Sequence, residues 1–182
     1  GDSAAVLEVA PKAARRAVAL RAHRVAVAQY ARALRFSDAL PPGERADLLE
    51  ALSYECYLTS EFAEAIAYRQ KAMAIWRELG DRQREGDALR WMSRCFWFAG
   101  NNDDAVATAE AALAVLVLLP PGRELAMAQS NRSQLYMLED ENQLAIDWGE
   151  RAMMLAESLG ETEIFLHALT NVGNARMRIG EP

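Results

Sequence analysis

Apolar residues recur along this chain at spacings of three and four residues, in long segments that are separated by proline and glycine. One segment carries Ala88, Leu89, Met92, Cys95 and Phe96 at the spacing that places them on one side of an α-helix. The pattern therefore predicts a succession of helices, each ending at a proline, a glycine or a polar turn. We expect helices near residues 12–20, 23–37, 44–59, 61–79, 81–99, 102–119, 122–139, 141–159 and 161–179.

The helices pair into a repeat with a period of 40 residues, as the alanines at 65, 105 and 145 show. The turn between paired helices repeats at the same interval, at Ser60, Gly100, Asp140 and Gly180. One hairpin alone leaves an apolar face in water, so the hairpins must stack to bury a core. We expect a single domain over 1–182, with hairpins over 12–37, 44–79, 81–119 and 122–159 and a half repeat over 161–180.

Composition supports an all-α chain, because alanine is more frequent than valine, isoleucine and threonine together. No apolar run is long enough to cross a membrane, and the first residues do not resemble a signal peptide. Two cysteines without a CxxC spacing indicate a reducing compartment, and we expect a cytoplasmic protein. The net charge of −6 gives no reason to expect direct nucleic-acid binding.

The hairpin resembles a degenerate tetratricopeptide repeat. It has a small residue in the first helix of each pair (Ser53, Ser93, Ser133 and Gly173), then a turn, then paired alanines in the second helix. The long period, and the strings at 8–17, 86–91, 120–128 and 168–173, resemble the sensor region of large ATP-dependent LuxR-type (MalT-like) regulators. The resemblance implies a right-handed α–α superhelix, or solenoid. It also implies a nucleotide-binding domain before this chain and a helix-turn-helix after it, so we expect a fragment of a longer protein.

The chain offers little for catalysis. His23 and His167 are far apart, and the acidic clusters fall at helix starts, where they stabilise the helix dipole. It contains no GxxxxGK[ST] string for phosphate binding. We therefore expect no enzyme activity, no metal site and no cofactor in this chain.

The candidate binding site is a concave groove lined by the first helix of each hairpin. Steps of about 40 residues bring together aromatic, arginine and amide side chains, a mixture that suits a peptide or an anionic small molecule. The predicted groove residues are Glu50, Tyr54, Tyr57, Arg90, Arg94, Trp97, Asn131, Gln134, Asn171 and Asn174. For the tryptophans the competing interpretation is that they fill the joints between helices.

Two further segments, one basic and one apolar, each allow more than one interpretation. The basic stretch Lys12–Arg35 contains no acidic residue. It forms a solvated helix face or a docking face for a neighbouring domain, with direct contact to DNA as the least favoured alternative. The apolar run Leu113–Leu119 must turn Val115 or Val117 outwards. It is either a patch for self-association or interdomain contact, or it is covered by the turn at 120–122.

The chain is thus expected to be a non-catalytic binding and sensing module of a LuxR-type regulator, which takes up a peptide, a partner domain or a metabolite. The alternative is an adaptor scaffold for protein assembly without any role in transcription.

Overall fold

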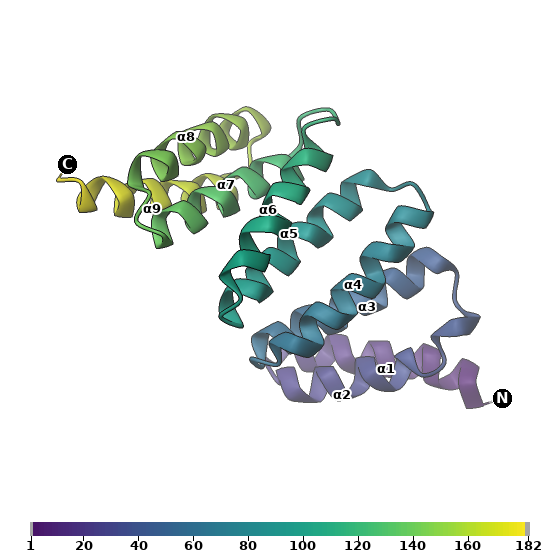
Figure 1. Cartoon of the computed structure of the whole chain (residues 1–182). Helices are drawn as coiled ribbons and strands as arrows, with labels where there is room; N and C mark the ends of the chain where they lie inside the picture. The colour runs from purple at the N-terminus through teal and green to yellow at the C-terminus, as the bar shows by residue number, and fades with distance from the viewer. Residues whose placement is uncertain (1, 181–182) are drawn as a thin grey trace. The chain divides into compact units, whose positions relative to one another are not determined.

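The computed structural model describes residues 2–180, and within this range it contains helices and turns but no strand. The helices are α1 (Asp2–Ala19), α2 (His23–Leu34), α3 (Pro42–Leu58), α4 (Phe62–Glu78), α5 (Arg82–Phe98), α6 (Asn102–Leu116), α7 (Arg123–Leu138), α8 (Asn142–Leu159) and α9 (Thr162–Arg178) (Figure 1). A short 3-10 helix, Ser37–Ala39, follows α2. The all-helical class predicted from the repeat is confirmed.

The largest difference from the expected helix bounds is at the first helix, which begins at Asp2 and runs through Pro11. A proline inside a helix removes one hydrogen bond and costs about 3 kcal/mol. The flanking sequence is rich in alanine, and Ala10, Ala14 and Ala17 are buried in a core that they share with residues of α2 and α3. Burial of this face outweighs the local cost, which is why the break expected at Pro11 was wrong.

Two other helices end earlier than expected. The second helix stops at Leu34, before the 3-10 helix, and α6 stops at Leu116, four residues before Pro120. The expected turn at the end of the chain begins at Gly180, whereas Glu181 and Pro182 lie outside the described residues.

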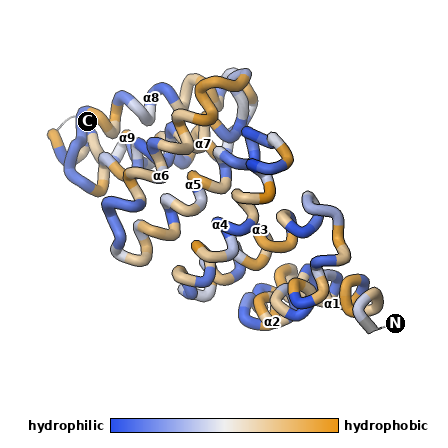
Figure 2. Tube along the Cα trace, turned by 45° about the vertical axis from the view of Figure 1, so that its right-hand side comes forward, coloured by the Kyte–Doolittle hydropathy of each residue, from blue (hydrophilic) through white to orange (hydrophobic). Residues whose placement is uncertain are grey.

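The chain divides into two compact units. Unit 1 comprises Gly1–Asp81 and Cys95–Asn101, and unit 2 comprises Arg82–Arg94 and Asn102–Pro182. In unit 1, α1 packs against α2, α2 against α3 and α3 against α4. In unit 2, α7 packs against α6, α8 and α9. Figure 2 shows hydrophobic and hydrophilic residues interspersed along these helices, as expected where one side of each helix is buried.

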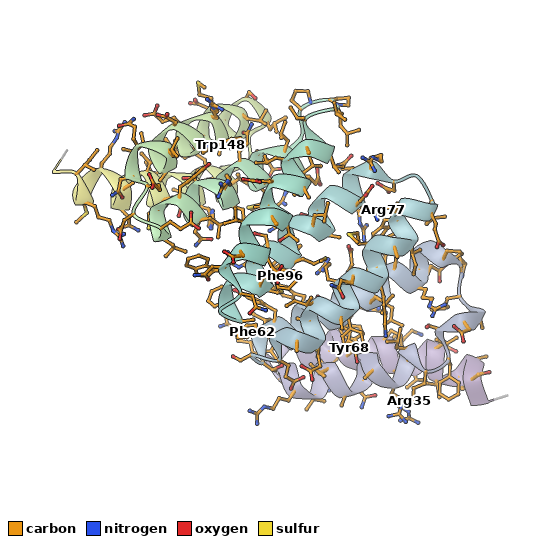
Figure 3. The ribbon with its side chains drawn as sticks, viewed as in Figure 1. Arg35, Phe62, Tyr68, Arg77, Phe96 and Trp148 are labelled. Carbon is orange, nitrogen blue, oxygen red and sulfur yellow. The ribbon has the colours of Figure 1, made fainter. Side chains whose placement is uncertain are left out.

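Unit 1 is held together by a core of small and medium side chains. Leu52, Cys56 and Cys95 belong to one buried cluster with the alanines of α1 and α2, and Tyr68 packs against its edge (Figure 3). Both cysteines are free thiols, as expected for small buried side chains. Burial and the neighbouring Glu61 raise the pKa of the Cys56 thiol to about 12.

Unit 2 contains a close approach of helices at Gly149 of α8. A Cβ atom at this position would lie 2.3 Å from Cγ2 of Val172 on α9 and 2.9 Å from Oγ of Ser133 on α7. Glycine therefore allows α8 to approach both neighbours. Ser133 is fully buried and donates a 2.7 Å hydrogen bond to the carbonyl oxygen of Ala145.

The turns repeat their backbone conformation at the predicted interval. Ser60, Gly100, Asp140 and Gly180 have φ angles of 64°, 82°, 63° and 77°. This left-handed conformation ends the first helix of each hairpin, and it is natural for glycine but sterically unfavourable for Ser60. The 40-residue period is therefore expressed in the backbone as well as in the alanine pattern.

Candidate functional site

All ten predicted groove residues lie on first helices of hairpins, as the repeat predicted. They are Glu50, Tyr54 and Tyr57 on α3, Arg90, Arg94 and Trp97 on α5, Asn131 and Gln134 on α7, and Asn171 and Asn174 on α9. Their surroundings differ widely, from exposed at Tyr54 and Asn174 to buried at Arg90, Asn131 and Asn171. Their role in binding remains a prediction.

In unit 1, Glu50 takes part in a largely buried network with the second helix of its own hairpin. Its Oε1 lies 3.0 Å from Nη1 of Arg69 and 3.2 Å from Nε1 of Trp76, both on α4. Arg69 is only 4% exposed, and its Nε also lies 3.4 Å from Oγ of Ser53. These contacts show that Glu50 joins α3 to α4, a structural role that spacing alone did not reveal.

The tyrosines of α3 belong to an aromatic cluster. Tyr54 is 40% exposed and stacks on Tyr57, with ring centroids 6.3 Å apart. Tyr57 meets Phe98 at 5.5 Å, and Phe98 stacks on Phe62 at 5.8 Å. Phe62, labelled in Figure 3, begins α4. Phe62 and Phe98 were not predicted as site residues, because they lie within two residues of the turns and outside the stripe of groove positions that repeats every 40 residues.

In unit 2, three predicted groove residues are buried and hydrogen-bonded internally. Arg90 pairs with Asp87 at 2.8 Å and lies 4.6 Å from the centre of the Trp91 ring. Asn131 donates to Oγ of Ser93 at 3.0 Å, and Asn171 donates to the carbonyl oxygen of Ser130 at 3.1 Å. The bonds of Asn131 and Asn171 join α5 to α7 and α7 to α9, so these two side chains hold neighbouring repeats together, whereas the contacts of Arg90 with Asp87 and Trp91 lie within α5.

Three partly exposed polar side chains, Arg94, Gln134 and His167, lie around the buried Ser130, and we call these four residues the α5–α7–α9 face. Nη1 of Arg94 lies 3.4 Å from Oε1 of Gln134. Nδ1 of His167 lies 2.6 Å from Oγ of Ser130, one helical turn before Gln134 on α7. All four belong to unit 2, and Arg94, Gln134 and His167 are partly exposed.

His167 was not predicted as a site residue, yet its electrostatic surroundings are distinctive. Burial lowers the pKa of His167 below its usual value, and the positive charges of Arg94 and Arg90 lower it further, against the opposing effect of Glu163. His167 was not predicted because the two arginines that act on it lie on α5, two repeats earlier in the sequence. The available signal was that His167 lies one helical turn before Thr170, which is two steps of 40 residues after Arg90.

The basic stretch and the apolar run are both exposed in part. Arg32 and Arg35 line a cleft of about 540 Å³ between α1 and α2, together with the apolar residues Val9 and Phe36. In the apolar run, Val115 is buried whereas Val117 is 64% exposed, so the outward residue is Val117. A docking role for Lys12–Arg35 and self-association through Leu113–Leu119 remain predictions.

Within the described residues, no group of three or more histidine, cysteine, aspartate or glutamate side chains is placed to hold a metal ion. In the same range, none of the helices combines the length and the apolar character needed to cross a bilayer.

Comparisons with known proteins agree with this architecture. The sequence family described as tetratricopeptide repeat matches residues 44–116. A search of curated protein sequences gives no match.

Solved structures of helical repeats are similar over nearly the whole chain. A variant of nearly identical TPR-like repeats, attributed to a kinesin light chain of Podosopora anserina, has a TM-score of 0.74 at 16% identity, covering 96% of this chain and 86% of that one. BtubC (BKLC) from P. vanneervenii has a TM-score of 0.72 at 16% identity, covering 98% and 83%. The MamA protein has a TM-score of 0.60 at 13% identity, covering 94% and 91%. At these identities the likeness concerns the fold, which is tetratricopeptide-like.

Proposed function

We propose that this chain is a non-catalytic binding module that takes up a protein or peptide segment on the first helices of its hairpins. The tetratricopeptide match over residues 44–116 supports this class of function, because such repeats generally act as scaffolds for protein–protein interaction. The fold supports it as well, since stacked hairpins present side chains from several repeats on one extended surface.

The observation that carries the proposal is the contact between Arg94 and Gln134, which are 40 residues apart on α5 and α7. It shows that equivalent positions of successive first helices meet on one face. A ligand on that face would contact several repeats at once, and Arg94 could form forked hydrogen bonds to a carboxylate.

The finer part of the proposal is that the module is the sensor region of a LuxR-type transcription regulator in the cytoplasm. Its support is the resemblance of the sequence strings at 8–17, 86–91, 120–128 and 168–173. In such a protein, occupancy by a peptide, a partner domain or an anionic metabolite would bias a nucleotide-driven switch. The alternative is an adaptor scaffold. A phosphate-binding loop before this chain and a helix-turn-helix after it would favour the regulator, and their absence from the full gene product would exclude it.

Site-specific photo-crosslinking tests the binding function. Benzoylphenylalanine is placed at Asn174 on α9, and a matched control is placed at Met154 on α8, where the side chain is 66% exposed. Both variants are expressed in the source cells and irradiated. We expect one defined protein to crosslink from Asn174 and not from Met154. Equal crosslinking from both positions, or none from Asn174, would contradict the proposal.

A further inference from the structure

The first hairpin carries a cleft that the predicted groove does not include. It lies in unit 1, between the first half of α1 and the end of α2, and has a volume of about 540 Å³. This volume falls within the range of small-molecule sites, roughly 300–1,000 Å³. Its described lining contains none of the ten predicted groove residues. The cleft is therefore a separate candidate for a binding site.

One part of the cleft is apolar. Val6 packs against the buried core cluster of α1, α2 and α3, whereas Val9 on the next turn of α1 is 62% exposed. Phe36, which follows the end of α2, is 37% exposed and faces the same cleft. Covering these side chains with an aliphatic chain removes apolar surface from water, which favours binding.

The other part of the cleft is basic. Arg32 lies in the last turn of α2 and Arg35 is the C-cap residue of that helix, so their spacing of three residues places them on one side of it. Figure 3 labels Arg35 at the outer edge of the hairpin. Among the described side chains, those of residues 3–180, neither arginine has an ion-pair or hydrogen-bond partner. The two guanidinium groups are therefore available to an anionic ligand.

The acidic residues close to the cleft in sequence pair elsewhere. Glu8 contacts Lys12 at 3.0 Å, and Asp38 contacts Arg45 at 3.0 Å. The described lining of the cleft contains no aspartate or glutamate, and the segment from Lys12 to Arg35 has none either. The local charge thus attracts anions, although the whole chain is acidic.

We propose that this cleft binds a free single-chain amphiphile with a carboxylate headgroup, that is, a fatty acid. The aliphatic chain lies on Val6, Val9 and Phe36, and the carboxylate is held by Arg32 and Arg35. Guanidinium groups stay charged and present planar donors that match a carboxylate. An apolar lining with a few polar groups that fix the orientation is the usual construction of a ligand site. The inference goes beyond the proposed function, because it concerns another surface and another class of ligand.

The shape of the site favours a free amphiphile over a bilayer. A membrane surface is nearly flat on the scale of one hairpin, so it is contacted by side chains that protrude from a helix face. A concave cleft instead encloses a ligand that enters it. Bilayer binding is therefore treated as a competing outcome of the test.

The test uses the whole chain and sodium laurate as the probe, at concentrations below micelle formation, with the dissociation constant measured by calorimetry at pH 7.5. The carboxylate is ionised at this pH. We expect saturable binding to one site. Dodecyltrimethylammonium has the same aliphatic chain but a cationic headgroup, and should bind at least about tenfold more weakly because the arginines repel it. Acetate, which has the headgroup without the chain, should also bind at least about tenfold more weakly.

Matched variants locate the site, and all five substituted side chains are exposed. Replacing Arg32 and Arg35 together by glutamine weakens laurate binding at least about tenfold, whereas Arg24→Gln, at the start of the same helix, leaves the affinity unchanged. Val9→Asn weakens binding at least about threefold, and Val25→Asn, a 53% exposed valine on α2, leaves it unchanged. Circular dichroism verifies that each variant is folded, and the Val9→Asn result tests the site independently of the arginines.

The proposal is overturned if laurate does not bind, if either comparison probe binds as tightly, or if the control variants weaken binding as much as the cleft variants. It is also overturned if the chain sediments with vesicles of phosphatidylcholine and phosphatidylglycerol through Arg32 and Arg35 but does not bind monomeric laurate. A dimer in analytical ultracentrifugation that Val9→Asn disrupts and laurate leaves intact would assign the cleft to a second copy instead. None of these results changes the expected crosslinking from Asn174, so the two proposals fail independently.

Discussion

Arg69 of α4 and Gly149 of α8 lie 80 residues apart at the same position of two hairpins, and each faces the buried serine of its own hairpin. Nε of Arg69 lies 3.4 Å from Oγ of Ser53, whereas a Cβ at Gly149 would lie 2.9 Å from Oγ of Ser133. One hairpin therefore fills this position with a long charged side chain, and the other leaves no room for a methyl group.

Gly149→Ala is expected to destabilise the protein by about 1–3 kcal/mol, because the added methyl group meets Val172 and Ser133 in a close-packed interior. Gly173→Ala on α9 is the matched control. A Cβ there meets nothing within 4 Å, and alanine in a helix gains about 0.5–1 kcal/mol over glycine. Urea unfolding followed by circular dichroism measures both. Equal effects of the two substitutions would show that α8 does not depend on Gly149 for its approach.

Ser53→Ala is expected to cost more stability than Ser133→Ala. Both serines donate a 2.7 Å hydrogen bond to a helix carbonyl of the paired helix, worth about 1 kcal/mol. Ser53 also accepts a hydrogen bond from the buried Arg69. Removing the Ser53 hydroxyl takes this partner from a buried charged group, which costs about 1–3 kcal/mol more. The free energies of unfolding of the two variants decide the order, and a larger loss at Ser133 would contradict it.

Glu50→Ala is expected to lower the free energy of unfolding by about 3 kcal/mol, because it leaves the buried guanidinium of Arg69 without this carboxylate. Glu44→Ala, an exposed glutamate in the first turn of the same helix, should cost less than about 1 kcal/mol through its interaction with the helix dipole. Thermal unfolding of both variants provides the comparison. If Glu50→Ala leaves stability unchanged and abolishes partner binding, Glu50 is a binding residue, as its place in the stripe first indicated.

Stability should fall as the pH drops below about 6.5, partly because of His167. The pKa of His167 is lowered in the folded protein, so the fold favours the neutral imidazole. The contribution of the neutral His167 imidazole to the free energy of unfolding is fully present above the ordinary histidine pKa of about 6.5. It is lost as the pH falls towards the lowered pKa of the folded protein. Unfolding free energies at pH 7.5 and 5 should differ less in His167→Gln than in the unsubstituted protein, and an unchanged difference would contradict this assignment.

The Cys56 thiol should react slowly with Ellman's reagent at pH 8. Its pKa is raised to about 12 by burial, so the reactive thiolate is scarce in the folded state. In a Cys95→Ser background, the rate should rise at least about a hundredfold when urea unfolds the protein. A fast reaction in the folded state would show that Cys56 is reached by solvent.

The repeat and its turns could be predicted because they depend on local properties of the chain. Spacing of apolar residues identified the helices from α2 to α9, and the turn positions at Ser60 and Asp140 followed from the period although neither is glycine. Residues on the first helices were likewise placed correctly, since position within a repeat fixes which helix a residue belongs to.

Burial of individual polar groups could not be read from the same pattern. Asn131 and Asn171 find buried partners on neighbouring helices, and Glu50 finds Arg69, because these bonds depend on distances between helices that a sequence period does not contain. The continuation of α1 through Pro11 is a similar case, in which tertiary burial outweighs a local rule.

The contacts between successive hairpins of unit 2 join residues about one period apart. Arg94 meets Gln134 and Arg123 meets Glu163, each 40 residues further on. A deletion or insertion of a few residues between such partners would rotate and shift every later helix against its neighbour. Loss or duplication of a complete 40-residue block would instead bring equivalent positions back into register. The length of this protein can therefore change only in steps of a whole hairpin if the contacts between repeats are to be kept.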